Sequence, residues 1–75
     1  STEETGEAWI LLGTSIFSQA GPEDLPIWQR ARAAFEKALA FENVRSLARQ
    51  WIDYIDAVRQ TYEAQQAMEA ARGAP

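Results

Sequence analysis

The chain has 75 residues, of which 47% are hydrophobic and 24% are charged, and its formal net charge is −4. A chain of this size folds as one small domain with a thin stability margin, which excludes a large private active-site cavity. It has no histidine and no cysteine, so it lacks the commonest general base, thiolate metal ligands and disulfides. No segment approaches the roughly 20 apolar residues of a membrane span. We therefore expect a soluble, intracellular and cytoplasmic protein that has no cofactor, bound metal, small-molecule substrate or membrane partner.

The charges are unevenly distributed along the chain. Residues 1–24 hold five acidic residues and no basic one, residues 25–50 hold five basic against two acidic residues, and residues 51–75 hold four acidic against two basic ones. A nucleic-acid site needs a basic patch, and the single candidate is Arg45 with Arg49, one helical turn apart. The charge pattern therefore favours a protein partner over nucleic acid.

The N-terminal part predicts a flexible acidic lead-in followed by one helix. Residues 1–6 are small, polar and acidic, which is typical of a loose segment. The next apolar residues recur at spacings of three and four, as in a core-facing helix: Trp9, Leu12, Ile16 and Phe17. Gly21 and Pro22 supply a stop signal. We expect this helix over residues 7–20.

Two further helices follow. Pro26 suits the first turn of a helix, and the second helix is expected over residues 26–41. The third begins near Val44 and carries an apolar stripe of nearly heptad period: Val44, Leu47, Ala48, Trp51, Tyr54, Ile55, Val58 and Tyr62. The apolar stripe thins after Tyr62, so we divide the chain into the lead-in, a helical interaction domain over 7–62, and a projecting or frayed helix end over 63–75.

Small residues on these helices predict close packing. Gly13 allows the second helix to approach, and the alanines of that helix leave room for large side chains from its neighbours. The positions expected to be most buried are Trp9, Leu12, Trp28, Ala31, Phe35, Ala38, Leu47, Trp51 and Ile55.

The first two helices resemble a tetratricopeptide repeat. Trp9, Leu12 and Gly13 match the Trp-x-x-Leu-Gly signature of its first helix. The second helix of the repeat has a small residue, an aromatic residue four positions on, and then Lys-Ala-Leu, and the matching residues here are Ala31, Phe35, Lys37, Ala38 and Leu39. A related repeat of RNA-processing scaffolds is echoed by "RARAAFEKAL" and "WIDYI". The resemblance implies an antiparallel helical hairpin that binds proteins.

The sequence also departs from this repeat. The connection after the first helix is longer than the tight turn of the family, the proline that closes the second helix is replaced near Asn43, and no second full repeat follows. A single repeat needs a cap, and the long third helix can supply it. The fold class is therefore all-α: a three-helix arrangement with a repeat-like antiparallel hairpin and a C-terminal capping helix, or an unrelated three-helix bundle that packs in the same way.

Two apolar surfaces are candidate partner-binding sites. The second face of the first helix offers Ile10, Thr14 and Phe17, which line either a groove or a contact with the third helix. The third helix offers Val58, Tyr62 and Met68 beyond the expected reach of the hairpin, where a second copy or a partner helix could cover them. Asp53 and Asp56 are paired carboxylates without further ligands, and we interpret them as solvent-exposed.

The sequence thus predicts a non-enzymatic interaction or adaptor module that recognises a partner helix or peptide through apolar helical surfaces. The first alternative is a structural or regulatory homo-oligomer that associates through the third helix. The second is a fragment of an RNA-processing scaffold, for which Arg45 and Arg49 would contact RNA.

Overall fold

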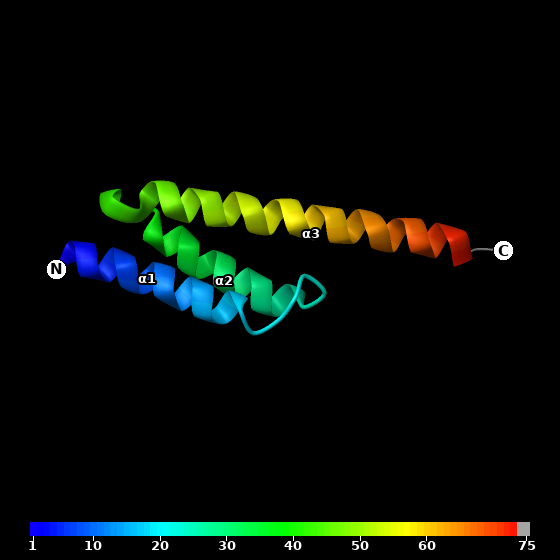
Figure 1. Cartoon of the computed structure of the whole chain (residues 1–75), viewed down its shortest axis with the longest axis horizontal. Helices are drawn as coiled ribbons and strands as arrows, with labels where there is room; N and C mark the ends of the chain where they lie inside the picture. Colours follow the sequence, from blue (N-terminus) through cyan, green and yellow to red (C-terminus); the bar gives the residue numbers. More distant parts are fainter. Residues whose placement is uncertain (74–75) are drawn as a thin grey trace.

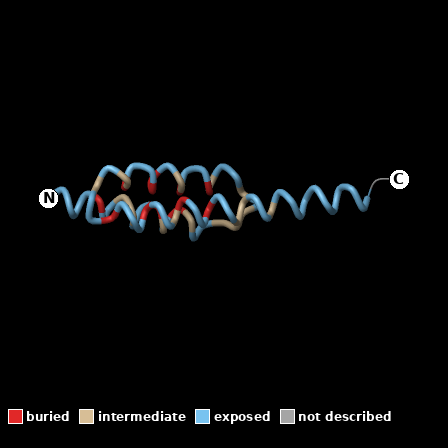
Figure 2. Tube along the Cα trace, turned by 90° about the horizontal axis from the view of Figure 1, so that it is seen from above, coloured by how far each residue is buried: buried red, intermediate tan, exposed pale blue. Residues whose placement is uncertain are grey.

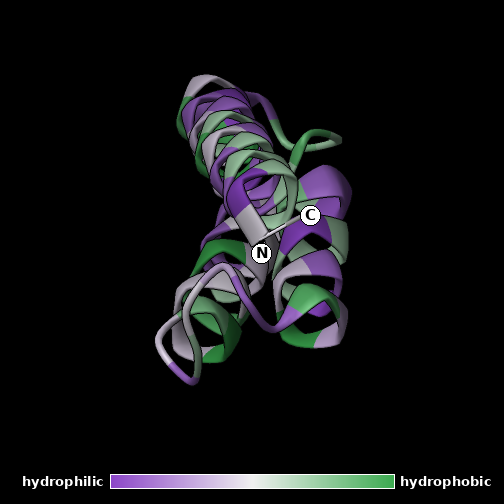
Figure 3. Ribbon diagram, turned by 90° about the vertical axis from the view of Figure 1, so that its right-hand side faces the viewer, coloured by the Kyte–Doolittle hydropathy of each residue, from purple (hydrophilic) through white to green (hydrophobic). Residues whose placement is uncertain are grey.

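The computed structural model describes residues 1–73, which form three α-helices and one short 3-10 helix. The α-helices are α1 (Thr2–Phe17), α2 (Leu25–Ala38) and α3 (Arg45–Gly73), and η1 (Glu42–Val44) precedes α3. α1 and α2 form an antiparallel hairpin, and α3 lies over this hairpin and runs in the same direction as α1 (Figure 1, Figure 3). The predicted all-α, three-helix fold is confirmed.

α1 begins at Thr2, so the expectation of a loose lead-in over residues 1–6 is wrong. The hydroxyl of Ser1 accepts a hydrogen bond from the backbone N–H of Glu4 at 3.2 Å and caps the helix. Glu3 and Glu4 lie in the first turn, where their charge interacts favourably with the helix dipole. The acidic residues that suggested a loose segment are therefore an N-terminal helix signal, and Gly6 is buried.

α1 ends at Phe17 rather than at residue 20. The Ser18 hydroxyl donates to the carbonyl of Ser15 at 2.8 Å, and the indole N–H of Trp28 donates to the carbonyl of Ala20 at 2.9 Å. Side chains thus satisfy backbone groups that a longer helix would use. α2 likewise ends at Ala38 rather than at residue 41, because Phe41 takes an extended conformation and packs beside Val44.

Gly13 sets the distance between α1 and α2, as the sequence predicts. A Cβ atom placed on Gly13 would lie 2.6 to 2.9 Å from three ring atoms of Phe35. The aromatic ring therefore rests directly on the backbone of α1, at a distance that only glycine allows.

The core consists of two adjoining clusters within the overlap of the three helices (Figure 2). The larger cluster contains Ile16, Trp28, Ala31, Phe35, Ile52 and Ile55. The smaller contains Ala38, Val44 and Ala48, with Trp9 and Phe41 partly buried against it. Five of the nine positions expected in the core are buried: Trp28, Ala31, Phe35, Ala38 and Ile55.

The other expected core positions are less buried. Leu12 is 45% exposed and Leu47 is 44% exposed, so both assignments are wrong. Trp9 and Trp51 are half-buried. Two residues that were not among the expected core positions, Ile16 and Ile52, belong to the larger core cluster instead. Leu12 belongs to neither core cluster, and Leu47 lines a surface groove together with Phe17 of α1.

The hairpin covers more of α3 than the helix lengths suggested. Val58 packs against the larger cluster, so it does not lie beyond the reach of the hairpin. Arg59 donates a hydrogen bond to the carbonyl of Pro22, which ties α3 to the α1–α2 connection. From residue 63 to residue 73 α3 is exposed on all sides and extends past the hairpin (Figure 2), and residues 74–75 of the expected end lie outside the described residues.

Candidate functional site

An aromatic cluster joins all three helices near the end of α1. The ring centroid of Phe17 lies 4.8 Å from that of Trp28 on α2, and 5.2 Å and 6.0 Å from those of Trp51 and Tyr54 on α3. Trp51 also stacks on Phe35 at 5.1 Å with an interplanar angle of 2°. Rings held by several neighbours have few alternative orientations, so this cluster is a stiff part of the surface.

A groove of about 390 Å³ opens beside this cluster, between α1 and α3. Its lining is mainly apolar and consists of Phe17, Leu47, Gln50, Trp51 and Tyr54. The four residues of α3 follow spacings of three, four and seven, and therefore share one helix face. Leu47 is 44% exposed and Tyr54 is 53% exposed. Large apolar side chains are thus presented to solvent on ordered helices, which is typical of an interaction surface.

The three candidate residues of α1 have different surroundings. Phe17 lines the groove. Ile10 packs against both core clusters and does not line the groove. Thr14 is half-buried, and its hydroxyl donates to the carbonyl of Leu11 at 3.0 Å. Leu11, which was not singled out from the sequence, is 67% exposed on the same helix.

The three candidate residues of α3 do not form one surface. Val58 packs against the core, and Tyr62 is half-buried with the guanidinium of Arg59 5.4 Å from its ring centroid. Met68 is 56% exposed on the projecting part of α3. The structure therefore divides this candidate site between the core and the free end of the helix.

Sequence reasoning did not indicate that two groove residues, Leu47 and Tyr54, are exposed. Leu47 and Trp51 were assigned to the core, and Tyr54 to the same apolar stripe. The apolar face of α3 is wider than the hairpin can cover and is centred differently from the predicted stripe. Ile55 is buried together with Ile52, which the stripe did not include, whereas Leu47 and Tyr54 are exposed. The width of an apolar face is the signal that could have indicated them.

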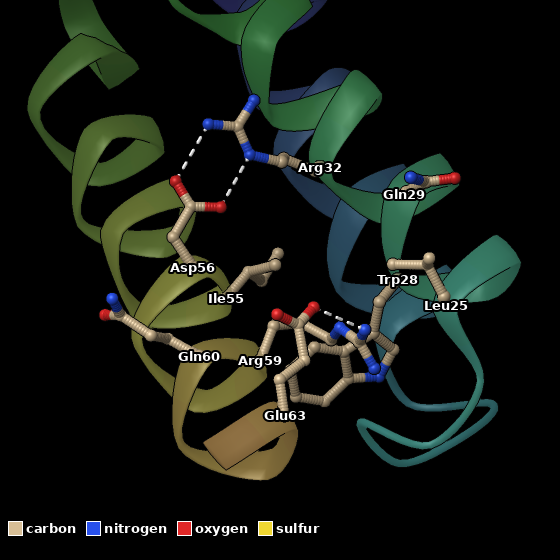
Figure 4. A pocket seen from close by; sticks show the side chains of 9 residues that line it. All are labelled: Leu25, Trp28, Gln29, Arg32, Ile55, Asp56, Arg59, Gln60 and Glu63. Carbon is tan, nitrogen blue, oxygen red and sulfur yellow. Dashed lines mark hydrogen bonds and ion pairs between the residues drawn. The ribbon is translucent and has the colours of Figure 1, made fainter. Parts of the chain in front are cut away.

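A second hollow of about 480 Å³ lies between α2 and α3 (Figure 4). Two arginines, Arg32 and Arg59, are among its lining residues, and both are already paired. The Arg32 guanidinium donates two hydrogen bonds of 2.8 Å to the carboxylate of Asp56, and Arg59 donates to Glu63 at 2.8 Å. Both guanidinium groups are thus paired with carboxylates, although the buried Nε of Arg59 has no hydrogen-bond partner within residues 1–73. The groove between α1 and α3 is the more apolar of the two and is the better candidate for binding a protein.

Asp56 has a structural role that the sequence did not reveal. Its side chain is about half exposed, as expected, but it is bound in a two-point ion pair with Arg32. The hydrogen bonds from this guanidinium hold the pKa of Asp56 below its usual value. The pair links α2 to α3 across 24 positions of sequence.

We expect Asp56→Asn to destabilise the fold by about 0.2–1 kcal/mol, the range for exposed ion pairs. Because the pKa of Asp56 is lowered in the folded chain, the pair contributes fully above the unfolded value of about 4, and this contribution is lost as the pH falls through the folded value. Urea unfolding at neutral and at acidic pH measures the difference. Asp53→Asn is the control, since Asp53 has no ion-pair partner in residues 1–73. An equal loss in both variants would contradict this role for Asp56.

The two candidate RNA-contacting arginines, Arg45 and Arg49, lie outside the groove between α1 and α3 and line a different hollow. The Nε of Arg45 donates to the carbonyl of Leu39 at 2.8 Å, and thereby satisfies a free carbonyl at the end of α2. Arg49 lines a shallow hollow with Leu39 and Arg45. The side chain of Arg45 is therefore engaged in a contact between α3 and the end of α2.

Residues 1–73 contain no cluster of three or more His, Cys, Asp or Glu residues that could hold a metal ion. None of the helices in this range is long and apolar enough to cross a membrane. Comparison of the chain with protein-family models, with curated proteins and with solved structures gives no match.

Proposed function

We propose that the chain is a non-enzymatic protein–protein interaction module that binds an amphipathic helix or apolar peptide in the groove between α1 and α3. The observation that carries the proposal is the exposure of Leu47 and Tyr54, at 44% and 53%, beside the aromatic cluster. A partner helix binds such grooves through apolar residues at spacings of three, four and seven. Each large side chain that the partner buries there is worth about 1.5–3 kcal/mol.

The arrangement of the lining supports this mode of binding. Trp51 is held between Phe35 and Phe17, so the floor of the groove does not need to reorganise when a partner binds. A preformed surface saves conformational entropy on association. The same proposal includes an adaptor or scaffold role in the cytoplasm, in which the groove joins this domain to other proteins.

A tetratricopeptide-like origin of the hairpin belongs to the same proposal. Its support is the direct contact between Gly13 and Phe35, two of the positions that match the signature of the repeat. In this interpretation α3 caps the single hairpin by covering the apolar face that a further repeat would otherwise cover.

Homo-oligomerisation through α3 is a second candidate, and one observation favours it. Residues 63–73 project from the hairpin with all side chains exposed, and Met68 is 56% exposed. Our proposal expects a monomer in light scattering over a wide concentration range. A dimer that Met68→Glu converts to a monomer would favour the oligomer instead.

Selection of peptides tests the groove directly. A displayed library of helical peptides of about 16 residues, a little over four turns, is selected on the intact chain. We expect the enriched peptides to share apolar spacings of three, four and seven, and to lose binding to the double variant Leu47→Ser, Tyr54→Ser. Leu12→Ser is the matched control, because Leu12 is equally exposed at 45% but lies outside the groove. Peptides that bind all three proteins equally would refute the proposal.

A further inference from the structure

Two acidic residues, one on α1 and one on α3, lie near the groove in the helical register. Glu7 precedes Ile10 by three residues and Thr14 by seven, so it lies on the groove side of α1. Asp53 follows the groove residue Gln50 by three positions on α3. Both acids are exposed, and neither has an ion-pair partner in residues 1–73. Neither acid lines the groove itself, but helical spacing places Glu7 on the same side of α1 as Thr14 and Asp53 one turn from Gln50 on α3.

The basic residues of the same region are all directed elsewhere. No basic residue lines the groove. Arg45 is bonded to the carbonyl of Leu39, Arg49 lines the hollow beside Leu39, and Arg59 is bonded to Pro22. The remaining bases of the hairpin belong to α2, which contributes no residue to the groove: Arg30, Arg32 and Lys37. The groove lining is thus mainly apolar and contains no basic side chain.

A second copy of this chain does not fit such a surface well. The projecting part of α3 could insert Met68 into the groove of a second copy. This segment also carries two acidic residues, Glu63 and Glu69, and one basic residue, Arg72, so it would add negative charge beside Glu7 and Asp53. The basic helix α2 has no large apolar side chain on its exposed face after Leu25. Like charges opposed across an interface reduce affinity, so the charges favour a different molecule.

We propose that the groove selects a basic amphipathic helix, whose apolar face lies on the aromatic cluster and whose lysine or arginine side chains face Glu7 and Asp53. This inference rests on the proposed function and adds the charge of the partner. Tyr54 strengthens it, since this residue is 53% exposed and an exposed tyrosine ring can bind a cationic side chain.

Two synthetic helical peptides test the inference. Both carry leucine at the same positions, with spacings of three, four and seven, and they differ only in lysine or glutamate at the positions beside the leucines. We expect the lysine peptide to bind the intact chain about threefold to tenfold more tightly at low salt, with a smaller advantage at high salt. Fluorescence anisotropy of labelled peptides measures both affinities.

Two double variants show whether the advantage arises at the groove. Glu7→Gln with Asp53→Asn should remove most of it, whereas Glu42→Gln with Glu69→Gln, which changes the net charge equally, should preserve it. Equal affinity for both peptides, or equal effects of the two double variants, would overturn the basic-partner inference while leaving the groove as a peptide site. Binding of neither peptide would overturn the proposed function itself, and with it this inference.

Discussion

Replacement of Phe35 by alanine is expected to destabilise the domain by about 3–5 kcal/mol, the cost of removing a fully buried phenylalanine. Phe35 is 0% exposed, stacks on Trp51 and rests on Gly13, so all three helices lose contacts at once. A chain of this size has few kcal/mol to lose, and most molecules should be unfolded near room temperature. Thermal unfolding followed by circular dichroism measures the effect.

Leu12→Ala is the control for this loss, because Leu12 is a large apolar residue that is 45% exposed. It should change the stability by less than about 1 kcal/mol. Unfolding of Phe35→Ala within a degree or two of wild type would show that the ring is not the centre of the core.

A single methyl group at Gly13 should also destabilise the fold. Alanine is favoured over glycine within a helix by about 1 kcal/mol, so propensity alone predicts a gain. The new Cβ would lie 2.6 to 2.9 Å from the ring of Phe35, and this ring is fully buried, so it has little free space into which to move. Overpacking of this kind costs about 1–3 kcal/mol, so we expect Gly13→Ala to unfold at lower urea concentration.

Gly73→Ala is the matched control for the added methyl group, since nothing lies within 4 Å of its position. It should leave the stability unchanged or slightly raised. If Gly13→Ala were as stable as this control, the close approach of α1 and α2 would be wrong.

The sequence predicts the helices well because its apolar spacings are strong and its small residues are placed where helices meet. The same reasoning failed at the start of α1, where Ser1 with Glu3 and Glu4 was interpreted as a loose segment although it caps a helix. Element boundaries depend on such local hydrogen bonds. Periodicity alone does not reveal them.

The candidate site was predicted less completely than the fold. Phe17 was identified, but Leu47 was placed in the core, because periodicity assigns a residue to a face without stating how much of that face a neighbour covers. The ion pair between Arg32 and Asp56 joins residues 24 positions apart, and no local pattern predicts such a pairing. Both features depend on how the three helices are rotated against one another.

The most direct test of the groove is a nuclear magnetic resonance titration of the ¹⁵N-labelled chain with the lysine peptide. Our account predicts that the changes in amide chemical shift concentrate in residues 10–18, which cover the second half of α1 and its C-cap, and in residues 47–58 of α3. The Leu47→Ser, Tyr54→Ser variant should show none of these changes. Shifts confined to residues 63–73, or to the face of α2 that points away from the groove, would contradict the central claim.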